Sequence, residues 1–268
     1  MVVGAIGDHR RMKDWPNMET SKPTYQRLWE VDTVRGIAII LMICYHFIFD
    51  LAFFGAYAGN MYSPSWQLFA RSIGTTFILV MGISLTLRYN RLEPEMDEKQ
   101  LFAIYLRQGA IVFGWGMVIT VVTYFVLDSG YVIFGILHLL GLSMLVAFPF
   151  LRSRWASLVV GIIAVALGFY LNGLKVLNPW LLWLGVPQFG RHMVDYYPLL
   201  PWFGFALVGV SVGLTLYPQG ARRFSLPDLS HIPPVRALGF LGRHSLLIYL
   251  IHQPIMLGIL IVIGIGSI

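Results

Sequence analysis

The order of apolar and polar residues divides the chain into seven long hydrophobic stretches joined by polar connections. An α-helix needs about 20 apolar residues to cross the hydrocarbon layer of a bilayer. Each stretch therefore predicts a transmembrane helix: Val34–Tyr57, Trp66–Arg88, Phe102–Leu127, Tyr131–Leu151, Trp155–Leu171, Pro198–Tyr217 and Ser245–Ile265. The pattern thus predicts an all-α, polytopic membrane helix bundle. Residues 1–33 are expected to form a polar cytoplasmic segment and residues 34–268 the transmembrane domain.

Lysine and arginine collect in alternate connections, and this distribution predicts the orientation of the chain, because these residues stay on the cytoplasmic side during insertion. Of the 19 basic residues, only Arg71, Lys175 and Arg191 fall on the opposite side. The N-terminus is therefore expected in the cytoplasm and the C-terminus outside. The long outer connection contains Pro179–Leu184, which predicts an interfacial or re-entrant segment. An eighth span there is the alternative, although it would disturb the charge pattern.

Composition agrees with a membrane protein. The chain is 57% hydrophobic and 12% charged, about half the charge of a soluble domain, which excludes a disordered chain. The basic residues lie between apolar stretches, so they do not indicate nucleic-acid binding. A single cysteine, Cys44, excludes a disulfide framework. The sequence has no Walker loop, no dinucleotide glycine fingerprint and no His-Glu-x-x-His motif, so nucleotide hydrolysis and a metal site are not expected.

Four ionisable residues lie deep within the predicted spans: His46, Asp50, His138 and His252. Such residues are costly in the apolar layer and commonly mark functional sites. At about 1.5 Å per residue, His46 lies about 18 Å and His252 about 14 Å from the cytoplasmic end of its span. His138 lies about 10 Å from the outer end of its own span. These similar depths predict one shared polar cavity.

His46 and Asp50 are four residues apart, so they share one face of a helix. A carboxylate in this position can orient an imidazole that acts as a general base; the alternative is that the two residues only neutralise each other. Taken alone, His138 is equally consistent with a satisfied core histidine. His252 precedes Pro254, which frees the carbonyl of Leu250.

Further polar residues lie beside His252 and near the ends of the spans. Gln253 is expected to face away from His252, whereas Asp195 and His192 lie near the expected outer mouth. At the cytoplasmic ends, the candidates for an anion site are Arg35, Arg107 and Arg243. These arginines either contact lipid phosphates or bind an anionic cofactor, because the guanidinium fork fits phosphate.

The segment Arg27–Met42 (RLWEVDTVRGIAIILM) resembles the opening of the heparan-alpha-glucosaminide N-acetyltransferase catalytic-domain family, including its small prokaryotic members. More widely it is similar to the membrane acyltransferase superfamily. The first span of that superfamily carries Asp-x-x-Arg-Gly and a histidine eleven residues past the arginine, here Arg35 and His46. Further patches of resemblance follow in order along the chain: residues 77–84, 135–141 and 242–252.

The resemblance implies an enzyme that takes an acyl group, expected to be acetyl, from cytoplasmic acetyl-CoA. The group would pass to a hydroxyl or amine, for example of a glycan, at the outer side of the cell membrane. Arg35 and His46 would correspond to the superfamily's essential arginine and its first-span histidine. Animal lysosomal members carry their catalytic histidine between the first two spans, but Ala56–Ser65 contains none. The heparan substrate is therefore not carried over, and the catalytic role would fall to His46.

Under this interpretation, His46 oriented by Asp50 removes a proton from the acceptor, and His138 or His252 stabilises the oxyanion. Arg35, Arg107 and Arg243 would bind the phosphates of acetyl-CoA. An acetylated His46 intermediate is an alternative route. The rival functions are a proton-coupled small-molecule transporter with a His/Asp relay and an inactive scaffold subunit. Acyl-CoA, a small or glycan acceptor and membrane lipid are the expected partners, and the oligomeric state stays open.

Overall fold

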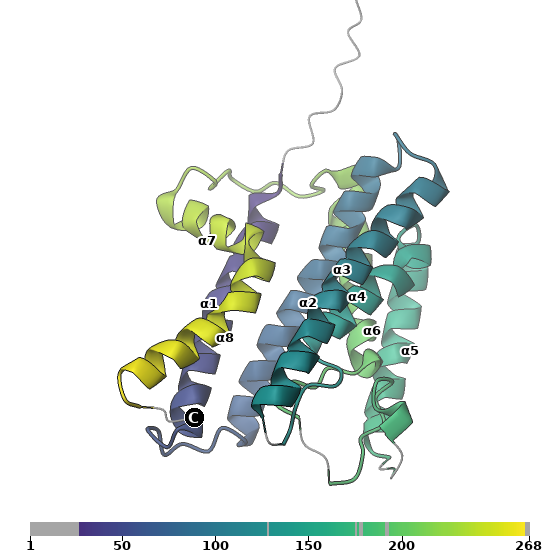
Figure 1. Cartoon of the computed structure of the whole chain (residues 1–268). Helices are drawn as coiled ribbons and strands as arrows, with labels where there is room; N and C mark the ends of the chain where they lie inside the picture. The colour runs from purple at the N-terminus through teal and green to yellow at the C-terminus, as the bar shows by residue number, and fades with distance from the viewer. Residues whose placement is uncertain (1–26, 128, 175, 177–178, 191–192, 266–268) are drawn as a thin grey trace, which may run out of the picture.

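The computed structural model describes residues 27–127, 129–174, 176, 179–190 and 193–265, and the predicted all-α class is confirmed (Figure 1). No β-strand forms among these residues apart from an isolated bridge between Val176 and Gln188. The α-helices of this part of the chain are α1 (Trp29–Phe53), α2 (Pro64–Leu92), α3 (Glu98–Val126), α4 (Ile136–Val146), α5 (Arg154–Asn172), α6 (Leu199–Leu216), α7 (Pro233–Arg243) and α8 (Ser245–Val262).

Within the described residues, 6 helices are long and apolar enough to cross a membrane: α1, α2, α3, α5, α6 and α8. The chain is therefore a multi-pass membrane protein. Many large apolar side chains on α3, α5 and α8 remain exposed, as expected of helices that face lipid. The predicted polar segment 1–33 falls mostly outside the described residues, but α1 already begins at Trp29. Glu30 and Asp32 thus belong to the first turn of the helix.

The fourth predicted span, Tyr131–Leu151, contains a much shorter helix than expected. Helix α4 has 11 residues, about 16 Å, or roughly half of the hydrocarbon layer. Gly135 is extended where the helix begins. Past its end, Pro149 lies in a 3₁₀ turn and cannot donate a helical hydrogen bond. The first turn of α4 is consequently buried within the bundle.

Helix α7 lies inside the connection between the last two predicted spans. It runs near the end of the bundle at which α1 begins (Figure 1), and its backbone touches that of α1. A Cβ added to Gly242 would lie 1.9 Å from the carbonyl oxygen of Asp32, and one added to Gly36 would lie 2.0 Å from that of Leu238. Both positions require glycine, so the glycine of the Asp-x-x-Arg-Gly motif seats α7 on α1.

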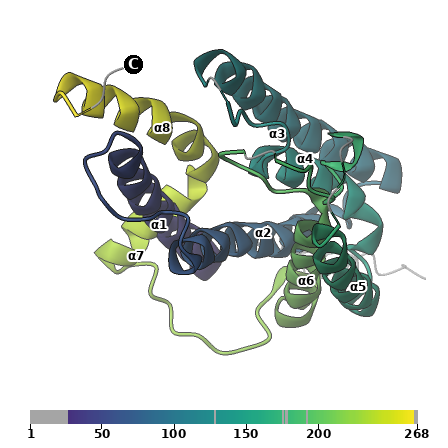
Figure 2. The same cartoon turned by 90° about the horizontal axis from the view of Figure 1, so that it is seen from below.

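Seen from below, the helices form two groups with α2 between them (Figure 2). Helices α7 and α8 pack against α1, whereas α6 packs against α2 and α5, and α3 packs against α4. The main apolar core belongs to the second group and includes the fully buried Tyr105, Leu139 and Leu207. The space between α1, α2 and α8 holds a smaller core around Ile39 and Ile73. His46 and His252 border this smaller core.

We expect Gly242→Ala to lower the midpoint of thermal unfolding of the protein in detergent, because the new methyl group would clash with backbone that cannot move aside. Overpacking of this kind costs about 1–3 kcal/mol. Gly258→Ala on α8 is the matched control, since a Cβ there meets nothing within 4 Å. Equal midpoints for the two variants would contradict the close contact of α1 and α7.

Candidate functional site

His46 on α1 and His252 on α8 meet inside the bundle. The Nε2 atom of His252 lies 3.3 Å from the Nδ1 atom of His46, and the two ring centroids are 4.9 Å apart. Each ring also contacts a carbonyl of its own helix: His46 Nδ1 lies 3.0 Å from the oxygen of Met42, and His252 Nδ1 lies 2.7 Å from that of Tyr249. Two of the three predicted histidines are therefore partners.

These contacts assign the hydrogens of the pair. A carbonyl oxygen only accepts hydrogen bonds, so His252 Nδ1 carries its hydrogen and donates to Tyr249. His252 Nε2 is then an acceptor, and His46 Nδ1–H is shared between it and the Met42 carbonyl. The Nε2 atom of His46 consequently keeps its lone pair, which is the requirement for a general base.

Asp50, one turn further along α1, pairs with Gln253 of α8. The Gln253 Nε2 atom donates to Asp50 Oδ1 over 3.3 Å. The expected hydrogen bond between His46 and Asp50 is not among those of the described residues, because each takes a partner on α8 instead. Gln253, which we expected to face away, thus belongs to the site. Asp50 Oδ2 and Gln253 Oε1 are buried without a protein hydrogen-bond partner.

The connection between α5 and α6 contacts this region through Asp195. The Asp195 carboxylate accepts the backbone N–H of Ile136 over 3.0 Å at the first turn of α4, and it shares a hydrogen bond with the hydroxyl of Tyr249 on α8. Burial raises the pKa of Asp195 to about 6, although these hydrogen bonds act to lower it. Asp195 thereby ties α4 to α8 beside the ring of His252, whose centroid is 5.7 Å from that of Tyr249. His192 lies outside the described residues.

His138 stands apart from the pair. Its Nδ1 accepts the N–H of Gly135 over 3.2 Å, and its Nε2 lies 3.4 Å from the hydroxyl oxygen of Thr120. Both nitrogens are occupied, and the ring packs between Phe113 and Phe134. The three histidines predicted to share one cavity therefore do not come together, and only His46 and His252 are neighbours. The contacts of His138 favour a structural role as the cap of α4.

A basic cavity of about 430 Å³ opens between the start of α1 and the end of α2, which the sequence predicts to face the cytoplasm. We call it the arginine cleft, and its basic lining residues are Arg27, Arg35, Arg88 and Arg91. Arg35 is fixed there by a hydrogen bond of 2.6 Å to the hydroxyl of Ser84 and by an ion pair of 3.5 Å with Asp32. The volume is within the usual range of ligand pockets, and clustered guanidinium groups suit phosphate.

Only one of the three predicted anion-binding arginines lines this cleft. Arg107 is exposed on α3, and Arg243 is exposed at the end of α7. Arg88 and Arg91 were missed as ligands, although their spacing of three residues at the end of a span places them on one helix face. The arginines of the cleft differ from Arg107 and Arg243 in the helix face on which they lie. Nearness to the end of a helix does not distinguish the two groups.

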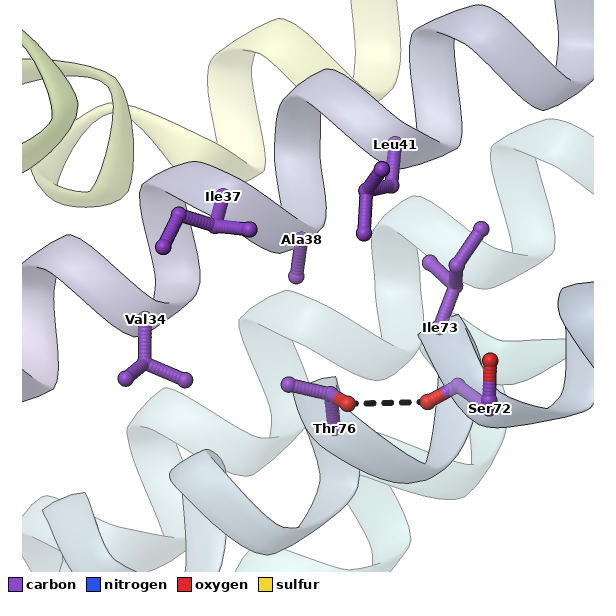
Figure 3. Close-up of a pocket in the computed structure, with 7 residues that line it drawn as sticks. All are labelled: Val34, Ile37, Ala38, Leu41, Ser72, Ile73 and Thr76. Carbon is purple, nitrogen blue, oxygen red and sulfur yellow. Dashed lines mark hydrogen bonds between the residues drawn. The ribbon is translucent and has the colours of Figure 1, made fainter.

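A second, smaller cavity of about 120 Å³ lies between α1 and α2 (Figure 3). Most of its lining is aliphatic, including Ile37 and Leu41. Its hydroxyl groups are satisfied by their own helix, since Thr76 donates to the carbonyl of Ser72 over 2.8 Å and Ser72 to that of Phe69 over 2.7 Å. The cavity is also smaller than ordinary ligand pockets. It offers no acidic, basic or nucleophilic side chain apart from these satisfied hydroxyl groups.

We expect nitrogen NMR of ¹⁵N-histidine-labelled protein in bilayers to separate the two kinds of buried histidine. His46 and His252 should both carry the hydrogen on Nδ1, whereas His138 should carry it on Nε2. Single His→Gln variants assign the signals. A shared tautomer for His138 and His252 would contradict the assigned network.

Comparison with known proteins follows the same residues. A sequence model of the family described as "Heparan-alpha-glucosaminide N-acetyltransferase, catalytic" matches residues 27–254, which is most of the chain. The matched region includes the arginine cleft, the histidine pair and the Asp50–Gln253 pair. No curated protein and no solved structure matches the chain.

Proposed function

The chain belongs to the heparan-alpha-glucosaminide N-acetyltransferase catalytic family, and we propose that it transfers an acetyl group from cytoplasmic acetyl-CoA to an acceptor on the outer side of the cell membrane. The observation that carries this proposal is the hydrogen-bonded His46–His252 pair, with a free Nε2 on His46. A basic site for the donor lies on its cytoplasmic side, and the polar Asp50–Gln253 pair lies further out.

The arginine cleft suits the phosphate groups of acetyl-CoA. Arg35, Arg88 and Arg91 place guanidinium groups around one cavity, and hydrogen bonds from charged donors to phosphate are among the stronger ones in proteins. His46 follows Arg35 by eleven residues on the same helix, about 16 Å along its axis. The long pantetheine arm of CoA is suited to carry the thioester over that separation. The donor would thus be held at the cytoplasm while its acetyl group reaches the pair.

The pair supports general base catalysis. His46 Nε2 would take the proton of an acceptor hydroxyl or amine as that group attacks the thioester carbonyl. The His252 Nε2 lone pair faces His46 Nδ1–H and would stabilise the positive charge that forms on His46. An aspartate plays this role in a Ser-His-Asp triad. An acetylated His46 would use the same nitrogen. His252 has no free N–H for an oxyanion, since its one hydrogen goes to Tyr249.

We expect His46→Ala to lower acetyl transfer by about 100-fold or more, because a general base contributes roughly 10²–10⁴-fold. The assay uses proteoliposomes with labelled acetyl-CoA outside and methyl glucoside or glucosamine inside. The exposed cytoplasmic His244→Ala is the control. Unchanged transfer by the His46 variant would remove this residue from the mechanism. Sugar uptake that depends on a pH gradient and needs no acetyl-CoA would indicate a transporter instead.

We expect Arg91→Gln to raise the KM for acetyl-CoA by about tenfold, since a hydrogen bond to a charged group contributes about 1.5–3 kcal/mol. The value of kcat should change little, because Arg91 lies far from the reacting atoms. Arg107→Gln removes the same charge from an exposed position outside the cleft. If both variants raise KM equally, the effect belongs to net charge and the cleft is not the donor site.

A further inference from the structure

The Asp50–Gln253 pair presents two buried oxygens that no protein group satisfies. Asp50 is only 3% exposed, and among the described residues no salt bridge reaches it. Its Oδ1 atom accepts from Gln253, whereas its Oδ2 atom and Gln253 Oε1 lack donors. A carboxylate and an amide oxygen only accept hydrogen bonds, and leaving them unpaired in a buried site is costly. Both oxygens therefore suit a ligand that donates hydrogen bonds.

The position of the pair indicates from which side such a ligand would come. Asp50 follows His46 by one helical turn toward the outer end of α1, and Gln253 adjoins His252 on α8. The unpaired oxygens thus lie next to the proposed base and on the side away from the arginine cleft. A group bound to them would come from the outside and lie beside the reacting atom.

We propose that the Asp50–Gln253 pair binds a hydroxyl group of a polyol acceptor, such as a sugar, and that the product is an O-acetyl ester. This inference rests on the proposed acetyl transfer and names its acceptor class. On α1, the Cβ atoms of His46 and Asp50 are separated by about 5–6 Å, as for any pair four residues apart. One sugar hydroxyl can donate to Asp50 Oδ2 while a neighbouring hydroxyl faces His46 Nε2.

A carboxylate at this place favours a hydroxyl over an amine. A nearby negative charge stabilises the protonated form of an amine, and an ammonium group has no lone pair with which to attack. A hydroxyl group can donate its hydrogen bond and remain a nucleophile, since its oxygen keeps two lone pairs. The site is thus suited to ester formation rather than to the amide formation in the family's name.

The proposed step balances without any further reactant. The hydroxyl oxygen attacks the thioester carbonyl carbon, and its proton moves to His46 Nε2. The new C–O bond forms and the C–S bond breaks, so the electron pair of that bond leaves with the CoA sulfur. His46 then returns the proton to the thiolate, which gives CoA thiol and the acetylated sugar and restores the neutral imidazole.

The unmodified protein provides the first test. Proteoliposomes receive labelled acetyl-CoA outside and equal concentrations of methyl glucoside and glucosamine inside. Hydroxylamine then cleaves esters and leaves amides. We expect the label on both sugars to be removed by hydroxylamine. Label that resists hydroxylamine and depends on His46 would overturn the ester inference while acetyl transfer stands. If neither sugar carries the label, the proposed function is overturned and this inference with it.

Variants test the residues themselves. Asp50→Asn keeps the shape of the side chain but replaces one acceptor oxygen, and we expect the KM for methyl glucoside to rise by about tenfold or more. The KM for acetyl-CoA should stay the same. Gln253→Met removes the second oxygen and serves if Asp50→Asn does not fold. Glu95→Gln, at an exposed carboxylate of the α2–α3 connection, is the control. An unchanged KM for the sugar in a folded variant of the pair would overturn the proposal.

Discussion

A polar group inside a bilayer has no water to bond with, so it must find its partner within the protein. This constraint explains the arrangement of nearly all the deep polar residues in the chain. His46 and His252 share a hydrogen. His138 caps α4 through Nδ1 and contacts Thr120 of α3 through Nε2, and Asp195 accepts a backbone N–H from the first turn of α4. Among the described residues, Trp29 Nε1 and Ser143 Oγ are single buried atoms without a partner, whereas the Asp50–Gln253 pair contributes two such oxygens to one place.

The same constraint separates His138 from His46. A ring with both nitrogens occupied, as in His138, has no lone pair to offer and no reason to face a substrate. His46 uses only Nδ1, and its Nε2 atom remains available. The three histidines look equivalent in the sequence because they lie at similar depths in the membrane. The number of ring nitrogens that the protein occupies is therefore a better indicator of the role of a histidine than its depth.

Much of the fold could be predicted from the sequence, because the length of apolar helix that crosses a bilayer follows from the thickness of its hydrocarbon layer. The short α4 and the surface helix α7 could not, since Gly135 and Gly242 act through backbone contacts that join distant segments. The site was predicted in part. The similar depths of His46, His138 and His252 predicted one shared cavity, whereas the structure joins only His46 and His252. The places of Gln253 and Arg91 depend on which way each helix face turns. That rotation is set by packing between helices, which one sequence does not display.

Arg35 and His46 lie on a single unbroken helix, α1, and this fixes the distance between them. An α-helix has a fixed rise per residue, so the separation between Arg35 and His46 is set by helix geometry and not by loop movement. Under the proposed function, a donor is then selected by the length of its arm as well as by its charge. A compact donor such as acetyl phosphate carries an acetyl group and a negative charge, yet it is too short to reach from Arg35 to His46.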